Sequence, residues 1–277
     1  MEIQWYPGHI AKAERQLKEQ LKHVDVVLEV IDARIPLASH HREVLNWIGS
    51  KPRLLVFNRM DMIPEKVLQE WDKWWESQGE KLYFTNAQQG KGIKALKKAT
   101  QSMGVAVNQR RKERGMRDRP VRAVVIGFPN VGKSALINRL IGRKVVASAR
   151  RAGVTRQLQW VRISPEIELL DAPGVIPGKL QNQKDAIKLA ICDDIGEASY
   201  DNQRIAATLI DLLVEVDQDS VLQSRYGLDP LSHTGEECIQ ILADTRYQGD
   251  KERAAVQLLN DFRKGLMGAI PLEFPPN

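Results

Sequence analysis

The stretch GFPNVGKS occupies residues 127–134 and directly follows the apolar run VRAVVI at residues 121–126. Its glycines let backbone N–H groups approach phosphates, and Lys133 has the length to reach a β- or γ-phosphate. The apolar run predicts a buried strand, and residues 134–141 have the spacing of a helix, whose N-terminus favours negative charge. The sequence therefore predicts the phosphate-binding loop of a nucleoside triphosphate site.

Oxygen-bearing side chains for a magnesium ion are available beside this loop. Ser134 ends the loop, Thr155 ends the run GVT, and Asp171 follows a short apolar run and opens the run DAPG. Hydroxyl and carboxylate oxygens are the ligands that Mg²⁺ takes beside substrate phosphates. We therefore expect Ser134, Thr155 and Asp171 to hold Mg²⁺, and Gly174 to leave its N–H free for the γ-phosphate.

A base-recognition segment, NRMD, begins at Asn58. The carboxylate of Asp61 can accept hydrogen bonds from N1–H and the exocyclic amino group of guanine, whereas adenine offers no such pair of donors. The stem of Arg59 can cover the base, and a backbone amide at Asn86 or Ala87 can support the guanine O6. These residues favour GTP; an ATPase or a metabolic P-loop enzyme is the alternative.

The order of these segments is unusual, because the guanine segment precedes the phosphate loop and DAPG comes last. An ordinary GTPase begins with the phosphate loop. In the permuted order the nucleotide domain ends just after DAPG, so the chain that follows would inherit the motion of that segment. The predicted nucleotide-binding residues are Asn58, Arg59, Asp61, Asn86, Ala87, Asn130, Val131, Gly132, Lys133, Ser134, Ala135, Thr155 and Gly174.

Hydrophobic patterning predicts an α/β fold followed by helices. Expected strands cover residues 24–31, 53–57, 81–85, 121–126, 159–163 and 167–170, and expected helices cover residues 9–23, 64–79, 93–103 and 134–141. This alternation predicts a parallel sheet with helices on both faces. Residues 1–178 would form the permuted GTP-binding domain and residues 179–277 a helical C-terminal domain, with helices near residues 205–216, 236–247 and 251–264.

Two segments allow more than one interpretation. The tryptophans of the helix at residues 64–79 have helical spacing, which favours core packing over a platform for stacking bases. Residues 108–119 lack apolar anchors and are expected to form a flexible basic linker.

Composition points to a cytoplasmic protein without a membrane segment. The chain has 277 residues, 43% hydrophobic and 27% charged, and no apolar stretch of the roughly 20 residues that a transmembrane helix needs. The N-terminus has no signal or transit pattern, and Cys192 and Cys238 lack the spacing of a metal or redox site.

Positive charge is concentrated around the phosphate loop. Residues 108–162 contain fifteen Lys and Arg against two acidic residues, a balance of +13, whereas residues 179–277 carry ten basic and seventeen acidic residues, a balance of −7. One nucleotide needs only a few cations, so the excess indicates a polyanion such as RNA. The alternative is a solvated basic loop.

The motifs together resemble a known family, the circularly permuted GTPases of the YlqF/YawG type, over nearly the whole chain. The shared segments are WYPGH at residues 5–9, DARIP at 32–36, NRMD, GFPNVGKS, GVT, DAPG and DFRKG at 261–265. Arg59 stands where the family usually has lysine. The resemblance implies an assembly factor of the large ribosomal subunit, which binds the particle and its rRNA with GTP and leaves after hydrolysis.

Hydrolysis needs a group that orients water, and Val175 after Gly174 has no hydrogen-bonding side chain. His9 is our candidate, to which the resemblance also points; capping of the first helix is its alternative role. Asn130 would either bind K⁺, a second candidate cofactor beside Mg²⁺, or form a turn. We expect slow GTP hydrolysis that ribosomal particles stimulate, by a protein that is monomeric off the ribosome and makes no membrane contact. A nucleotide-gated RNA-binding module with incidental hydrolysis is the alternative.

Overall fold

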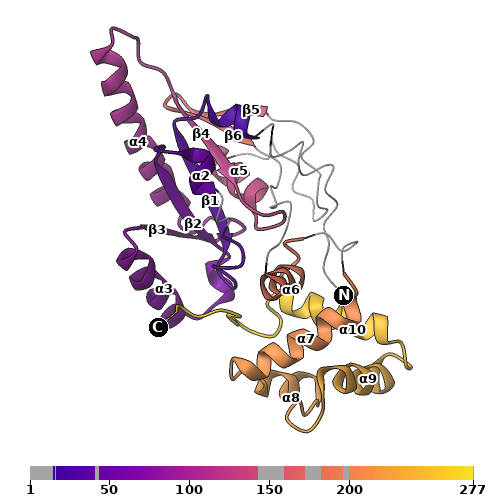
Figure 1. Cartoon of the computed structure of the whole chain (residues 1–277). Helices are drawn as coiled ribbons and strands as arrows, with labels where there is room; N and C mark the ends of the chain where they lie inside the picture. Colours follow the sequence, from indigo (N-terminus) through magenta and orange to yellow (C-terminus); the bar gives the residue numbers. More distant parts are fainter. Residues whose placement is uncertain are drawn as a thin grey trace.

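The computed structural model describes residues 15, 17–40, 44–142, 159–171, 182–195 and 200–276, which form a sheet and a group of helices (Figure 1). The strands are β1 (Val26–Asp32), β2 (Arg53–Asn58), β3 (Leu82–Thr85), β4 (Val121–Ile126), β5 (Gln159–Ser164) and β6 (Ile167–Asp171). The helices are α2 (Val44–Ile48), the short 3₁₀ helix η1 (Met60–Met62), α3 (Glu65–Ser77), α4 (Ile93–Glu113), α5 (Lys133–Ile141), α6 (Gln183–Ile191), α7 (Asn202–Glu215), α8 (Ser220–Tyr226), α9 (Gly235–Arg246) and α10 (Lys251–Arg263).

The strands form one six-stranded sheet in the order β3-β2-β1-β4-β6-β5. Neighbouring strands are parallel from β3 through to β6, which confirms the predicted parallel sheet. The edge strand β5 is the exception, because it runs antiparallel to β6. Only two residues separate β5 from β6, and a connection that short can join antiparallel strands only.

Helices cover both faces of the sheet, as the sequence predicts. Alternate side chains of β1 point to opposite faces, so Val26 and Leu28 pack with Leu136 of α5, while Ile31 packs with Trp71 of α3. The side chains of β1 are fully buried along its whole length. A strand covered on both faces needs the near-continuous apolar sequence that β1 shows.

The tryptophans of α3 belong to the core. Trp71 and Trp75 are buried and pack edge-on or tilted against Phe57 of β2, with ring centroids 6.3 Å and 6.5 Å away. Trp74 is partly buried against the same cluster. The core-packing interpretation is therefore confirmed, and these rings are not a base-stacking platform.

Helix α4 is longer than predicted, and the expected flexible linker at residues 108–119 is wrong. The helix continues to Glu113, because Gln, Arg, Lys and Glu are good helix formers even without apolar spacing. Gly115, at φ 69°, follows the end of the helix in the left-handed conformation that commonly ends helices. Asn108 then exchanges hydrogen bonds with the backbone of Arg119, at 2.9 and 3.1 Å, which fixes the returning chain.

Every element described after residue 182 is a helix, as the sequence predicts. The Asp250 side chain accepts from Arg253 N at 3.0 Å and begins α10 as expected. Helices α6 and α8 are additional to the three that the sequence indicates. The predicted domain boundary at residue 178 and most of the predicted helix at residues 9–23 lie outside the described residues. Within the described part of the chain, no helix is long and apolar enough to cross a membrane.

Candidate nucleotide-binding site

The predicted site lies at the carboxyl ends of the central strands. Strands β1 and β4 are neighbours, and from them the chain continues toward opposite edges of the sheet. Such a switch point leaves a crevice where ligands bind in open α/β sheets. Asp32 pairs with Asn58, and Asn58 pairs with Thr85, so the base-recognition segments end level with one another beside the phosphate loop.

The phosphate loop has a backbone that requires glycine at two positions. Gly127 has φ 150°, and a Cβ there would lie 2.3 Å from the carbonyl oxygen of Val30. Gly132 has φ 103°, and its Cβ would lie 2.2 Å from Nδ2 of Asn58. Both contacts are too close for any side chain, so the loop packs directly against β1 and the base-recognition segment.

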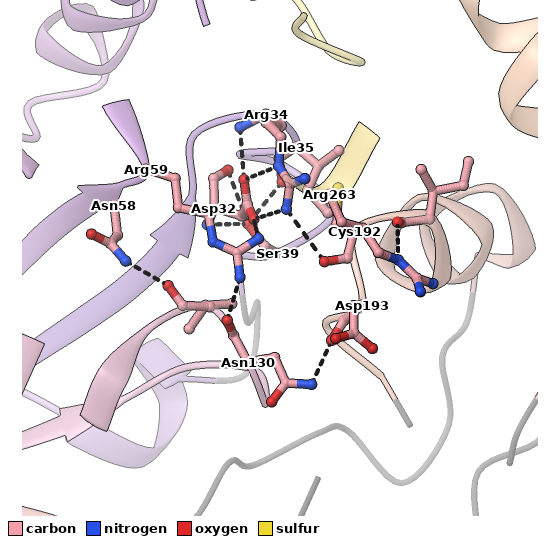
Figure 2. Close-up of polar contacts among 12 residues, drawn as sticks. Asp32, Arg34, Ile35, Ser39, Asn58, Arg59, Asn130, Cys192, Asp193 and Arg263 are labelled. Carbon is pink, nitrogen blue, oxygen red and sulfur yellow. Dashed lines mark hydrogen bonds and ion pairs between the residues drawn. The ribbon is translucent and has the colours of Figure 1, made fainter. Parts of the chain in front are cut away.

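Asn58 joins the loops of the site. Its Nδ2 donates to Val131 O at 2.8 Å (Figure 2). Its Oδ1 accepts from Ala87 N at 3.1 Å and from Thr85 Oγ1 at 3.2 Å. The side chain is buried. Asn58 therefore fixes the position of the phosphate loop relative to the loop after β3. It would support guanine binding by holding these two loops in place.

The phosphate side of the site begins at α5. Lys133 is buried, and its Nζ donates to Gly127 O at 3.1 Å and to Phe128 O, so the ammonium group lies within the loop. Ser134 follows in the first turn of α5, where unpaired backbone N–H groups favour an anion. The phosphate loop thus brings an ammonium group, a hydroxyl and a helix N-terminus together.

The base side of the site presents an exposed carboxylate. Asp61 is the middle residue of η1, the short helix that follows Arg59 at φ 62°, and no other described residue bonds to its carboxylate. Asn86 is buried, and its Oδ1 accepts from Gln89 N at 2.9 Å, which closes a turn after β3. The Ala87 amide, our candidate for guanine O6, donates to Asn58.

Arg59 makes contacts that the sequence did not indicate. Its Nη1 pairs with Asp32 Oδ2 at 2.9 Å, and its Nη2 donates to the backbone oxygen of Asn130 in the phosphate loop (Figure 2). The guanidinium group therefore connects the end of β1 with the phosphate loop. A side chain held this way fixes the base-recognition segment.

A buried ion pair lies behind this contact. Arg34 and Asp32 are both fully buried and form a two-point pair, with Nε–Oδ1 at 3.0 Å and Nη2–Oδ2 at 2.7 Å. Burial raises the pKa of Asp32, but the charges of Arg34 and Arg59 and the hydrogen bonds from Arg34 outweigh it, so that the pKa is below its ordinary value. Asp32 is therefore ionised at neutral pH.

The same arginine reaches the helical part of the chain. Arg34 Nη2 donates to Cys192 O at 3.3 Å, and the guanidinium group lies 5.2 Å from the ring of Phe262 in α10. The backbone oxygen of Arg34 accepts from Leu272 N at 2.9 Å. The sequence predicts a strand that ends at residue 31, directly before Asp32, but it gave no signal for these distant partners.

Asp194 adds a second buried carboxylate to this region. It is fully buried, and neither of its oxygens has a hydrogen-bond partner among the described residues; the same holds for Nη1 of Arg34. Burial and the charge of Asp32 raise the pKa of Asp194 well above its ordinary value, against the opposing charges of Arg59 and Arg34. The two carboxylates thus have pKa values shifted in opposite directions.

Asn130 has a partner in the helical part as well. It adopts φ 57° in the phosphate loop, and its Nδ2 donates to Asp193 O at 2.7 Å (Figure 2). This bond connects the phosphate loop directly with the chain after α6. The turn conformation is the role that the structure displays; the K⁺ role stays a prediction.

The predicted magnesium ligands are only partly described. Asp171 ends β6 and pairs through its backbone with Val125 of β4, immediately before the phosphate loop. Strands β4 and β6 are parallel, so Asp171 ends at the same end of the sheet as the phosphate loop that contains Ser134. The hydroxyl of Ser134 and the carboxylate of Asp171 are of the ligand types that Mg²⁺ takes, and their role as its ligands stays a prediction. His9, Thr155, Gly174 and the side chain of Asp171 lie outside the described residues.

A glycine-containing phosphate loop at the switch point of such a sheet defines a P-loop nucleotide-binding protein whose motif order is permuted. Residues 122–238 match the family model described as "50S ribosome-binding GTPase". The ribosome biogenesis GTPase A of Bacillus cereus is 34% identical over 99% of this chain and 95% of its own length. The Thermotoga maritima protein of that name is 30% identical over 73% of this chain and 70% of its own. The chain therefore belongs to the ribosome biogenesis GTPase A family.

Solved structures agree with the fold. The GDP-bound structure of Thermotoga maritima YlqF has a TM-score of 0.69 at 24% identity, covering 95% of this chain and 100% of that one. The GNP-bound structure of the same protein has a TM-score of 0.65, also at 24% identity, covering 96% of this chain and 99% of that one. The fold described above is thus the one seen in that protein.

Proposed function

We propose that the protein binds and hydrolyses GTP and acts as an assembly factor for the large ribosomal subunit, binding rRNA or ribosomal particles in a nucleotide-dependent way. The bridging position of Asn58 carries the first part, because one buried carboxamide connects the phosphate loop with the loop after β3. Membership of the family supports the second part.

In the bound complex each residue has a separate task. Lys133 would move from the loop carbonyls to the β- and γ-phosphates, and Asp61 would accept from guanine N1–H and its amino group. Ser134, Thr155 and Asp171 would hold Mg²⁺, which neutralises phosphate charge when bound. Asn86 and Ala87 would sit beside guanine O6.

The hydrolytic step requires a positioned water. We assign its orientation to His9, with the imidazole accepting or donating a hydrogen bond to that water. The water oxygen attacks the γ-phosphorus, and the bond from that phosphorus to the β–γ bridging oxygen breaks with its electron pair staying on GDP. The protons of the water stay on the phosphate formed, which releases one to solvent according to pH, and GDP and phosphate leave. K⁺ beside Asn130 would add positive charge to the transition state.

The helical domain, residues 179–277, would transmit the nucleotide state to the ribosomal particle. GTP would order the Thr155 loop and the segment after Asp171, and hydrolysis would release both. Residues 1–178 would act as the GTP-binding domain and residues 179–277 as the helical domain that follows its motion. We place the protein in the cytoplasm, as a monomer when it is off the ribosome.

GTP turnover by the purified protein tests this function. It should be measured in K⁺ buffer with and without large ribosomal subunits, for the wild type and for His9→Ala. We expect slow turnover alone, strong stimulation by subunits, and loss of stimulation in the variant while GTP and particle binding persist. Stimulation that survives His9→Ala would show that another group orients the water.

The alternative is a nucleotide-gated RNA-binding module in which hydrolysis is incidental. It predicts that subunits bind in a GTP-dependent manner but leave turnover unchanged. Base choice is tested separately with Asp61→Asn, because the amide can donate to the C2 carbonyl of xanthine. If Asp61→Asn does not shift the nucleotide preference from GTP toward xanthosine triphosphate, the alternative of an ATPase or a metabolic P-loop enzyme is favoured.

A further inference from the structure

The end of α4 and the turn after it form a projecting segment, residues 109–118, which we call the basic arm. Nine of its residues are exposed and the tenth, Arg111, is half-buried. Figure 1 shows this end of α4 standing out from the sheet. It is remote from the phosphate loop, so its charge has no evident use in holding a nucleotide.

Backbone and side-chain contacts hold the arm in one conformation. At its base, Asn108 exchanges two hydrogen bonds with Arg119, and Arg119 pairs with Asp25 at 2.7 Å. At its tip, Arg111 Nε donates to Arg117 O at 3.0 Å, and Met116 N donates to Arg111 O at 2.9 Å. The arm is therefore ordered before any partner arrives, which lowers the entropy cost of binding.

The cations of the arm divide into two groups, and its carboxylate Glu113 accepts a hydrogen bond from Gln109 at 3.3 Å. Lys112 pairs with Asp118 at 3.1 Å, and the Arg111 guanidinium group is occupied within the turn. The side chains of Arg110, Arg114 and Arg117 are exposed, and their guanidinium groups have no partner within the part of the chain that the structure describes. Three unpaired arginines on a rigid projection match the phosphate groups of a polyanion.

The arm also lacks what single-stranded nucleic acid requires. No Phe, Tyr, Trp or His occurs in residues 105–118, so unstacked bases have no ring to stack on. Duplex RNA is instead recognised by its shape and its phosphates. Carboxylates on an acidic protein partner could also pair with these arginines. The proposed partner particle, however, is made largely of RNA.

We propose that the basic arm docks on the sugar-phosphate backbone of duplex RNA, through Arg110, Arg114 and Arg117, independently of the nucleotide in the GTP site. This inference rests on the proposed function and names the surface that it uses. The arm would supply affinity for RNA that does not change with GTP hydrolysis, whereas the helical domain would supply the part that does.

The test compares the wild type with a variant carrying Arg110→Gln, Arg114→Gln and Arg117→Gln. Binding is measured to large ribosomal subunits, to protein-free large-subunit rRNA and to a short RNA duplex, over a series of salt concentrations. We expect at least about tenfold weaker binding to all three, and a salt dependence reduced by about one unit of log–log slope per lost phosphate contact. GTP turnover without particles should not change.

Exposed cations elsewhere provide a matched control. Lys66→Gln, Lys73→Gln and Lys81→Gln remove the same charge from α3 and from the residue before β3, outside the helical domain, and this variant should bind as the wild type does. Thermal unfolding would confirm that both variants fold.

Three outcomes would contradict the proposal in different ways. If the arm variant binds all three ligands as tightly as the wild type does, the RNA-docking role of the basic arm is overturned. The proposed function is then unaffected. Weaker binding of the arm variant to subunits alone, with rRNA and duplex binding intact, would make the partner a protein and overturn the RNA assignment. A wild type that binds no particle and no RNA would overturn the proposed function and the arm together.

Discussion

At the scale of single residues, the three hydrogen bonds of Asn58 lead to a testable expectation. Asn58→Ala leaves Val131 O and Ala87 N buried without their partner. Each unsatisfied group costs about 1–3 kcal/mol. We expect the free energy of unfolding to fall by about 2–6 kcal/mol and GTP to bind on the order of 10- to 100-fold more weakly, as measured by urea denaturation and nucleotide titration.

Asn108→Ala is the control for this change. It also removes two hydrogen bonds, at 2.9 and 3.1 Å, but these lie at the base of the arm, away from the phosphate loop. It should lower stability and leave GTP affinity unchanged. If Asn58→Ala lost stability to a similar degree and bound GTP normally, the positional role of Asn58 would be refuted.

The carboxylates of Asp32 and Asp194 should respond to pH with opposite signs. The pKa of Asp32 is lowered in the folded state, so its stabilisation is present above the unfolded pKa and is lost as pH falls through the folded pKa. The pKa of Asp194 is raised, so stability falls as pH rises from the unfolded pKa, near 4, through the folded pKa. At neutral pH the charge of Asp32 stabilises the folded state, whereas a charge on Asp194 would destabilise it.

Two isosteric variants check these signs at neutral pH by chemical denaturation. Asp32→Asn leaves Arg34 and Arg59 without their counter-charge and should cost about 3–5 kcal/mol. Asp194→Asn removes a buried carboxylate that has no described partner and should add about 1–3 kcal/mol, with a smaller decline in stability above pH 4. Destabilisation by Asp194→Asn would mean that Asp194 is ionised and pairs with Nη1 of Arg34.

The sequence predicted the residues of the phosphate loop, but it did not predict the tertiary contacts that hold the loops of the site in place. The glycines and Lys133 could be assigned because their mechanism demands fixed spacing within one loop. The contact of Arg34 with Cys192 could not, because it joins positions far apart in the sequence through tertiary packing. Asp32 gave a partial signal, as a carboxylate at the end of a near-continuous apolar strand.

At the scale of elements, strands were predictable where burial dictates sequence. Strand β4 spans Val121–Ile126 as predicted, because five of its six positions are buried and carry apolar residues, and only Arg122 is half-buried. The last turns of α4 escaped prediction because an exposed helix needs no apolar stripe. The helix propensity of its residues determines that this segment is helical, and hydrophobic periodicity could not detect it because the segment has no apolar face.

The packing of α9 on α7 gives a prediction for a whole helix pair. A Cβ at Gly235, the first residue of α9, would lie 2.3 Å from Ala207 O in α7. Alanine in place of glycine usually stabilises a helix by up to about 1 kcal/mol. Here we expect Gly235→Ala to destabilise by about 1–3 kcal/mol, because the helices must move apart.

Urea denaturation and nucleotide titration together locate this effect. The neighbouring change Glu236→Ala, at an exposed position of the same turn, should stay within about 0.5 kcal/mol of the wild type. GTP affinity should remain as in the wild type for both. A Gly235→Ala protein that is more stable than the wild type would show that α7 and α9 do not approach as closely as described.

At the scale of the whole molecule, the sheet and the helical tail share several contacts on one side of the site. Glu273 accepts from Leu37 N at 2.7 Å and pairs with Lys188 of α6 at 3.0 Å. Arg263 of α10 donates to Ala190 O and Ile191 O at the end of α6, at 2.9 and 3.0 Å. Helix α6 is therefore held between the loop after β1 and the last helix.

The bond from Asn130 Nδ2 to Asp193 O is where this assembly reaches the phosphate loop. Asn130→Gly keeps the positive φ of 57° accessible and removes the carboxamide. If the bond carries nucleotide state to the tail, the difference in hydrogen exchange between GTP-analogue-bound and GDP-bound protein should shrink across α6 and residues 192–195. The control is Asn138→Gly in the second turn of α5, which removes a carboxamide from the helix that follows the loop.

The same variant separates this coupling from a role in K⁺ binding. Turnover measured in K⁺ and in Na⁺ should show the same ratio in the wild type and in Asn130→Gly if the side chain acts through Asp193. Loss of K⁺ stimulation with an unchanged exchange difference would assign Asn130 to the cation and reject the coupling. Because hydrogen exchange reports local opening of α6 and turnover reports the chemical step, the two measurements respond independently to one side chain.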